Sequence, residues 1–98
     1  MIIRIVKMTF RATEVPAFVA LFEERKMLIR HFEGCRHLEL WQDAQDPNVF
    51  FTYSHWDSEG HLNKYRFSEL FKDTWFRTKA LFSAKAEAWS VQQKMVVD

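Results

Sequence analysis

The segment Val49-Phe50-Phe51-Thr52-Tyr53-Ser54-His55-Trp56-Asp57-Ser58-Glu59 decides the fold of this 98-residue chain. Its first eight residues are mostly β-branched or aromatic and include no glycine or proline, which predicts a strand over residues 49–56. The three residues that follow are typical of a helix start, so we expect a helix through about Tyr65. Ser68 resembles a second cap, which predicts a break in this helical region near Phe67.

The sequence before this segment predicts two more strands and another helix. Residues 2–11 are rich in Ile, Val, Thr and Phe and predict a first strand. Between Thr13, a candidate N-cap, and Gly34, a candidate helix stop, apolar residues recur at three- and four-residue intervals. That spacing predicts an amphipathic helix with Pro16 in its first turn. Residues 35–42 predict the second strand.

The remaining segments complete the order β-α-β-β-α-β. Residues 43–48 have turn chemistry of hairpin length, and the stretch from Trp89 to Val97 predicts a fourth strand. With right-handed crossovers, this order gives an α+β, ferredoxin-like fold: a four-stranded antiparallel sheet with two helices on one face. We expect residues 1–98 to form a single domain, because no linker, repeat or low-complexity segment interrupts them.

Apolar residues occur on both faces of the predicted sheet. In the first strand, Ile3 and Ile5 point to one face, and the residues that point to the other are Ile2, Val6, Met8 and Phe10. In the third strand, Val49, Phe51 and Tyr53 point to one face, and Phe50 and Trp56 point to the other. Two helices cover only one face, so an identical sheet is the simplest cover for the other. We therefore expect a homodimer in which two sheets pack face to face, a dimeric α/β barrel.

Composition excludes several classes of protein. The formal net charge is +1, so no overall field favours nucleic acid or an anionic membrane. The single cysteine, Cys35, rules out an intrachain disulfide and cysteine-based zinc motifs, and no two histidines have helical ligand spacing, so we expect no metal site. Neither a signal peptide nor an apolar run of transmembrane length is present, and we expect a cytoplasmic protein.

An RNA-recognition domain shares the same order of elements. Its third strand requires glycine and basic residues beside the stacking aromatics. Residues 48–53 (Asn-Val-Phe-Phe-Thr-Tyr) contain neither, so we do not expect RNA binding.

The chain resembles the antibiotic biosynthesis monooxygenase family of dimeric α/β barrels over nearly all its length. The segments that carry the resemblance are Phe32-Glu33-Gly34-Cys35, the turn at Asp46-Pro47, Phe51-Thr52-Tyr53-Ser54-His55-Trp56-Asp57-Ser58-Glu59 and Ser68-Glu69-Leu70-Phe71-Lys72. The haem-degrading branch of this family uses a helix tryptophan, a histidine ten residues later and an asparagine in the first strand. These positions fall on Tyr65, on Trp75 and near Lys7 or Met8, so ordinary haem ligation is not expected.

The resemblance to the oxygenase branch implies a reaction without a metal or flavin. A phenol or anthrone loses a proton, its electron-rich anion passes an electron to dioxygen, and the peroxide collapses to a quinone. Such a reaction needs a dry apolar slot, a base and polar groups that hold the anion. Aromatic residues make up 16% of the chain, enough to line a slot for a small flat aromatic molecule.

The sequence offers candidates for each of these roles. The catalytic candidates are His55 and His37 as base, since imidazole titrates in the right range, and Tyr53 as a hydrogen-bond donor to the substrate oxygen. The candidates for the substrate pocket are Trp75, Tyr65, Phe71, Phe82, Trp41 and Arg36, of which Tyr65 is a second possible donor and Arg36 a partner for an anionic substrate.

A structural role is the alternative for most of these residues. Phe71, Trp75 and Phe82 lie at helical spacing that suits core packing, and the strand histidines suit a dimer interface. The alternative function is a non-catalytic dimeric protein that binds a small molecule or acts as an accessory subunit.

Overall fold

The strand over residues 49–56 lies in the middle of the sheet. In the computed structural model, which describes all 98 residues, β3 (Val49–Trp56) lies between β2 (Cys35–Gln42) and β1 (Ile2–Thr9). The short β4 (Glu87–Val91) pairs with the other side of β1. All neighbours are antiparallel and the order is β2-β3-β1-β4. This confirms the predicted ferredoxin-like fold.

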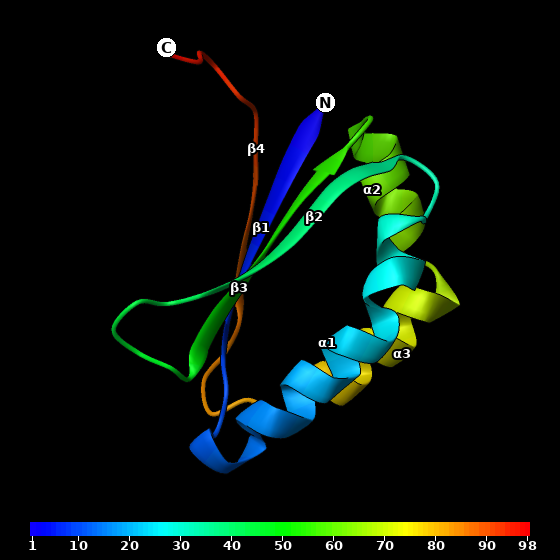
Figure 1. Ribbon diagram of the computed structural model, residues 1–98. Coiled ribbons are helices and arrows are strands. Elements are labelled where there is room, and N and C mark those ends of the chain that lie inside the picture. Colours follow the sequence, from blue (N-terminus) through cyan, green and yellow to red (C-terminus); the bar gives the residue numbers. More distant parts are fainter.

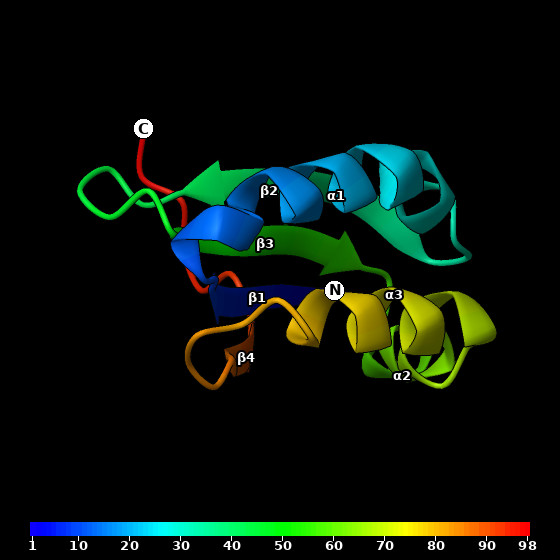
Figure 2. The same cartoon turned by 90° about the horizontal axis from the view of Figure 1, so that it is seen from below.

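Three helices pack on one face of the sheet: α1 (Val15–Arg30), α2 (Glu59–Arg66) and α3 (Glu69–Lys79) (Figure 1). A single turn of 3-10 helix, η1 (Ala12–Glu14), joins β1 to α1. Seen from below, α1 runs along the β2 side of the sheet, whereas α2 and α3 lie on the β1 side (Figure 2). None of the helices has the combination of length and hydropathy needed to cross a membrane.

Two serine caps divide the second helical region, as the sequence predicts. The hydroxyl of Ser58 accepts a hydrogen bond from the backbone N–H of His61 at 3.1 Å, and α2 begins at the next residue. The hydroxyl of Ser68 accepts one from the backbone N–H of Phe71, also at 3.1 Å, and starts α3. Each side chain satisfies a backbone donor that has no partner within its helix, so two separate helices form instead of one.

The first helical region differs in detail from the prediction. The predicted cap, Thr13, lies inside η1, and α1 begins at Val15 without a side-chain cap. Its end at Arg30 precedes the predicted stop, Gly34, whose positive φ of 87° belongs to the connection to β2. Pro16 occupies the first turn of α1, where a missing N–H carries no cost.

The first and last strands are shorter than predicted. β1 ends at Thr9 rather than residue 11, and Phe10 forms an isolated bridge with Phe82. β4 spans Glu87–Val91 rather than Trp89–Val97. It pairs with β1 from Lys7 to Ile3, and β1 begins at Ile2, so the residues beyond Val91 have almost no partner strand left.

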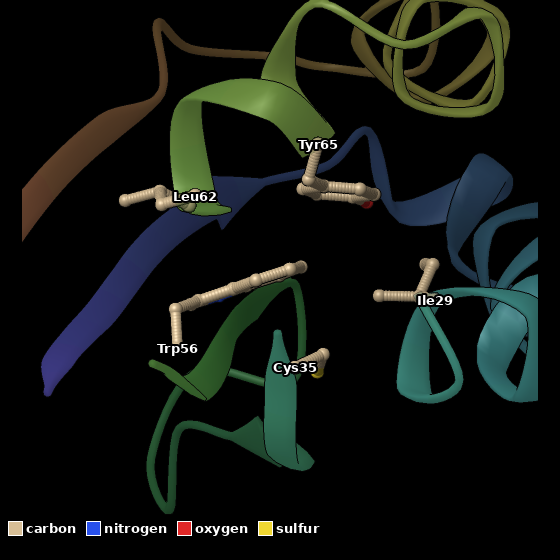
Figure 3. Packing of buried hydrophobic residues seen from close by; sticks show 5 residues of the cluster. All are labelled: Ile29, Cys35, Trp56, Leu62 and Tyr65. Atoms are coloured by element: carbon tan, nitrogen blue, oxygen red, sulfur yellow. The ribbon is translucent and has the colours of Figure 1, made fainter. Parts of the chain in front are cut away.

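The even-numbered residues of β1 and β3 face the helices and form two buried clusters. Met8, Phe10 and Phe50 pack against Phe18 of α1 in the first cluster. The second cluster consists of Trp56, Cys35, Ile29, Leu62 and Tyr65 (Figure 3). Trp56 and Phe10 are each only 1% exposed, which places the centres of the core on the helix-covered side of the sheet.

No helix covers the other face of the sheet (Figure 1). The odd-numbered residues of β1 and β3 point to this face and give it a second apolar surface. We call it the open face: Ile5 pairs with Tyr53 and Trp89, and Phe51 pairs with Trp41. The Trp41 and Trp89 side chains are 38% and 45% exposed. The expectation of apolar residues on both faces is thus met, and one face of the sheet is not covered by any other part of the chain.

We expect Gly34→Ala to lower the free energy of unfolding by about 1–3 kcal/mol, because its φ of 87° is strained for any residue with a Cβ atom. An added Cβ would also lie 2.5 Å from Cβ and Cγ of His61. Urea unfolding measures the change.

Gly60→Ala is the matched control for this change. Its Cβ would meet only the Ser58 hydroxyl at 3.6 Å, inside a helix, so stability should hold or rise by up to about 1 kcal/mol. Equal losses in the two variants would contradict the role given to Gly34.

Candidate functional site

A cavity of about 280 Å³ lies between the helices and the helix-facing side of the sheet. Thirteen of its nineteen lining residues are hydrophobic, and they include members of both buried clusters, such as Phe18 and Trp56. The small residues Ala86 and Ala88 beside β1 leave space there that larger side chains would fill. The cavity is near the lower end of the sizes typical of small-molecule sites, which suits one or two fused rings.

Aromatic rings form one wall of this cavity. The rings of Trp56 on β3 and Tyr65 on α2 stack with centroids 4.8 Å apart and an interplanar angle of 22° (Figure 3). Phe71 of α3 meets Tyr65 edge-on at 5.2 Å and stacks with Trp75 at 5.9 Å. All four residues line the cavity, so a flat aromatic molecule would find both ring faces and ring edges to contact.

The hydroxyl of Tyr65 is a hydrogen-bond donor without a partner in the chain. Tyr65 is only 9% exposed. Every fully buried side-chain oxygen or nitrogen in the chain has a hydrogen-bond partner, so the unpaired Tyr65 hydroxyl is not fully buried. It is accessible from the cavity that Tyr65 lines. Burial raises the pKa of Tyr65 far above its ordinary value, and the phenol therefore stays protonated. It can donate a hydrogen bond to an oxygen of a bound molecule.

Two arginines that the sequence analysis did not single out also line the cavity. Arg4 lies on β1 and Arg66 in the last turn of α2. Arg4 was detectable in the sequence, because it shares the helix-facing side of its strand with Ile2, Val6 and Met8, where a charge is out of place. No histidine, aspartate or glutamate lines the cavity.

The six predicted pocket residues do not all meet there. Tyr65, Phe71 and Trp75 line the cavity. Phe82 does not; it packs edge-on against Trp75 at 5.6 Å and closes the core behind it.

The other two predicted pocket residues lie on different surfaces. Trp41 lies on the open face, where its ring stacks on Tyr53 at 4.6 Å. Arg36 is exposed and makes a bidentate ion pair with Asp57, with both N–O distances at 2.7 Å, so its charge is already neutralised.

The three predicted catalytic residues lie together, but on the open face of the sheet. His37 pairs with His55 across β2 and β3, and their ring centroids are 5.1 Å apart. Nε2 of His55 lies 2.7 Å from the hydroxyl of Tyr53. Glu39 accepts a hydrogen bond from Nε1 of Trp41 at 2.7 Å and contacts Nε2 of His37.

Strand alternation explains the separation between these groups and the cavity. In β3, residues 53 and 55 point away from the helices, whereas Thr52, Ser54 and Trp56 point toward them and line the cavity. The sheet itself stands between the imidazoles and a molecule bound in the cavity. The catalytic role assigned to His55, His37 and Tyr53 stays a prediction, and it refers to a different surface from the predicted pocket.

The charges on the open face influence one another. Burial and the neighbouring His37 lower the pKa of His55, while Glu39 opposes this shift. Hydrogen bonds from Trp41 and His37 lower the pKa of Glu39. The structure brings no group of three His, Cys, Asp or Glu side chains close enough to hold a metal ion.

The fold and the cavity together define a small ferredoxin-like protein with an aromatic-walled site between helices and sheet. The sequence model of the family described as antibiotic biosynthesis monooxygenase matches residues 1–75, and the chain belongs to this family. No curated protein sequence matches the chain.

Solved structures share the fold at low sequence identity. A conserved protein of Methanosarcina mazei is 22% identical, with a TM-score of 0.89 over 96% of this chain and 94% of that one. A structure described as an antibiotic biosynthesis monooxygenase is 17% identical, with a TM-score of 0.89 over 95% and 98% of the two chains. A Mycobacterium tuberculosis protein is 18% identical, with a TM-score of 0.88 over 99% and 98%.

We expect the pKa of His55, followed by NMR titration, to lie below that of an exposed histidine, about 6.5. Glu39→Gln should lower it further, because the carboxylate favours the imidazolium. Glu33→Gln, which removes a carboxylate paired with Lys64, should leave His55 unchanged. An unperturbed or raised His55 pKa would contradict the described environment.

Proposed function

We propose that this protein is a monooxygenase that converts a small phenolic substrate to a quinone without a metal or flavin, inside the cavity between the helices and the sheet. The observation that carries the proposal is the aromatic wall formed by Trp56, Tyr65, Phe71 and Trp75 around a space of about 280 Å³, in a chain of the antibiotic biosynthesis monooxygenase family. The wall suits a flat ring, and the family supplies the class of reaction.

The proposed reaction needs only the substrate and dioxygen. The phenol loses its proton, and the resulting anion transfers an electron to dioxygen. The two radicals combine at the ring carbon para to the oxygen, and loss of water from the hydroperoxide leaves the quinone. One oxygen atom of dioxygen enters the product and the other leaves as water, so a phenol plus dioxygen gives a quinone plus water.

Tyr65 has the central part in this mechanism. Its protonated hydroxyl donates a hydrogen bond to the substrate oxygen and so stabilises the anion that reacts with dioxygen. The apolar lining excludes bulk water from the peroxide stage. Because no imidazole or carboxylate lines the cavity, the phenol passes its proton to solvent water as it enters, before the apolar lining excludes water from the peroxide stage.

A non-catalytic binding protein is the second candidate function. The observation in its favour is the absence of a general base among the cavity-lining residues. It shares the cavity and the aromatic ligand with the first candidate, and turnover distinguishes the two.

Oxygen uptake with a panel of substituted phenols and hydroxylated naphthalenes, whose one or two rings fit the cavity, tests the enzymatic function. Tyr65→Phe should lower kcat/KM by about 10²-fold, because the anion loses its hydrogen-bond donor. Tyr53→Phe makes the same chemical change on the open face and decides between the two surfaces.

A larger loss from Tyr53→Phe than from Tyr65→Phe would move the reaction to the open face, with His55 or His37 as base. Ligand-dependent increases in melting temperature without oxygen uptake for any compound would favour the binding protein.

A homodimer is the second part of the proposed function. The open face presents apolar side chains from all four strands, among them Ile5, Phe51, Trp41, Trp89 and Val91, and nothing within the chain covers them. A second copy of the same face is complementary to it in an isologous arrangement. The histidine cluster then lies at the interface between the two sheets.

We expect sedimentation to show a dimer at micromolar concentration and Phe51→Lys to convert it to a monomer, since a charge on the interface would be buried without a partner. Phe76→Lys makes the same change on α3, where Phe76 is already 70% exposed, and should leave the dimer intact. A wild-type monomer, or a dimer that survives Phe51→Lys, would contradict this arrangement.

A further inference from the structure

Two of the residues that line the cavity are arginines without a carboxylate partner. Arg4 lies opposite Ser54 and Ser90 in the sheet, and its only side-chain hydrogen bond is donated from Nη1 to the hydroxyl of Ser90 at 2.9 Å. Arg66 makes neither a hydrogen bond nor an ion pair through its side chain. Both belong to a cavity whose lining includes no acidic residue.

The other arginines that contact charged or polar groups are more fully satisfied. Arg25 pairs with Asp73 at 2.7 Å and also donates to Thr74, and Arg36 pairs with Asp57. Arg11 and Arg30 donate to backbone carbonyls that are left over at element ends. Arg4 and Arg66 therefore differ from these arginines in having most of their N–H groups free to bind a ligand, and both line the cavity.

The two positive charges also act on each other. Burial and the charge of Arg66 both lower the pKa of Arg4, although a guanidinium stays protonated at neutral pH. Arg4 is half-buried whereas Arg66 is exposed, so the cost of placing two like charges close together falls mainly on Arg4 unless an anion compensates them. The dipole of α2 favours a cation at the position of Arg66, but no such effect favours Arg4 on the helix-facing side of a central strand.

We propose that the cavity binds an aromatic carboxylate, with Arg4 and Arg66 holding the carboxylate and the aromatic wall holding the ring. A planar carboxylate matches the two parallel N–H groups of a guanidinium, and it supplies the missing negative charge. The ring system fits against Trp56 and Tyr65, and the volume of the cavity limits it to about two fused rings.

This inference rests on the proposed function for the choice of site and narrows its substrate to phenols that also carry a carboxylate. The carboxylate does not react. It orients the ring, so that the phenolic oxygen of the substrate meets the Tyr65 hydroxyl, and it compensates the charge of Arg4, which has no carboxylate partner in the chain.

Isothermal titration with 2-naphthoate and 2-naphthamide tests the proposal directly. The two probes have nearly the same shape and differ in charge, and neither requires turnover. We expect the wild-type chain to bind 2-naphthoate at least tenfold more tightly than 2-naphthamide, with a preference that weakens as salt increases.

Arg4→Gln should remove this preference, lowering the affinity for 2-naphthoate at least tenfold while changing that for 2-naphthamide by less than about threefold. Arg4→Lys keeps the charge but loses the paired N–H groups and should give an intermediate affinity. Arg77→Gln removes an exposed arginine of α3 that pairs with Asp73, and it should bind both probes like the wild type.

The melting temperature of the unliganded chain provides a second measurement. Because Arg4→Gln relieves an uncompensated charge, its melting temperature should equal or exceed that of the wild type, whereas the loss of a structural arginine would lower it.

Equal affinity for the two probes, binding of neither, or the same loss in Arg77→Gln would overturn the inference. Its failure is separable from that of the proposed function. Tight binding of 2-naphthoate without oxygen uptake on any phenol would support the carboxylate site and contradict the oxygenase function. Turnover of neutral naphthols without a preference for 2-naphthoate would support the oxygenase function and contradict the carboxylate site.

Discussion

The stack of Tyr65 on Trp56 is the interaction on which the helical layer and the cavity both depend. Trp56 ends β3 and is 1% exposed, and its indole N–H donates to the Ser54 hydroxyl at 3.0 Å, which fixes the plane of the ring. Tyr65 lies flat on that plane and so sets where α2 crosses the sheet. The position of α2 in turn places Phe71 and Trp75 of α3 opposite the strands. The stack of Tyr65 on Trp56 thus closes the second buried cluster and also forms part of the wall of the cavity.

Local chemistry predicted most of the fold because the signals are short-range. Ser58 and Ser68 each cap a helix through a hydrogen bond that spans three residues, so sequence spacing alone locates them. The bounds of β2 and β3 were equally predictable from the β-branched and aromatic residues within them and the turn residues between them. The end of β4 could not be predicted in this way, because it depends on where β1, its partner strand, ends. Thr13 does not cap a helix, because it lies inside the 3-10 turn η1 that precedes α1.

The candidate site was predictable only in part, for a reason of geometry. The alternation of β3 was visible in the sequence and separates His55 and Tyr53 from Trp56, but residue types alone do not show which face the helices cover. The predicted site therefore combined residues from both sides of the sheet. The same alternation could have identified Arg4. A charged residue on the same side of the strand as Ile2, Val6 and Met8 indicates a binding site on that side, where packing alone would favour an apolar residue.

The interruption between α2 and α3 divides one wall of the cavity between two helices. Each of these helices has its own serine cap, and the hydroxyl of Ser68 also donates to the carbonyl of Tyr65 at 2.6 Å, which ties the start of α3 to the end of α2. The Trp56–Tyr65 stack therefore also fixes the point from which α3 starts, and Phe71 in the first turn of α3 packs back on Tyr65. Trp75, one turn further along α3, contacts Phe71 and Phe82 rather than the stacked rings, so the size of its side chain sets the volume of the cavity separately from the stack.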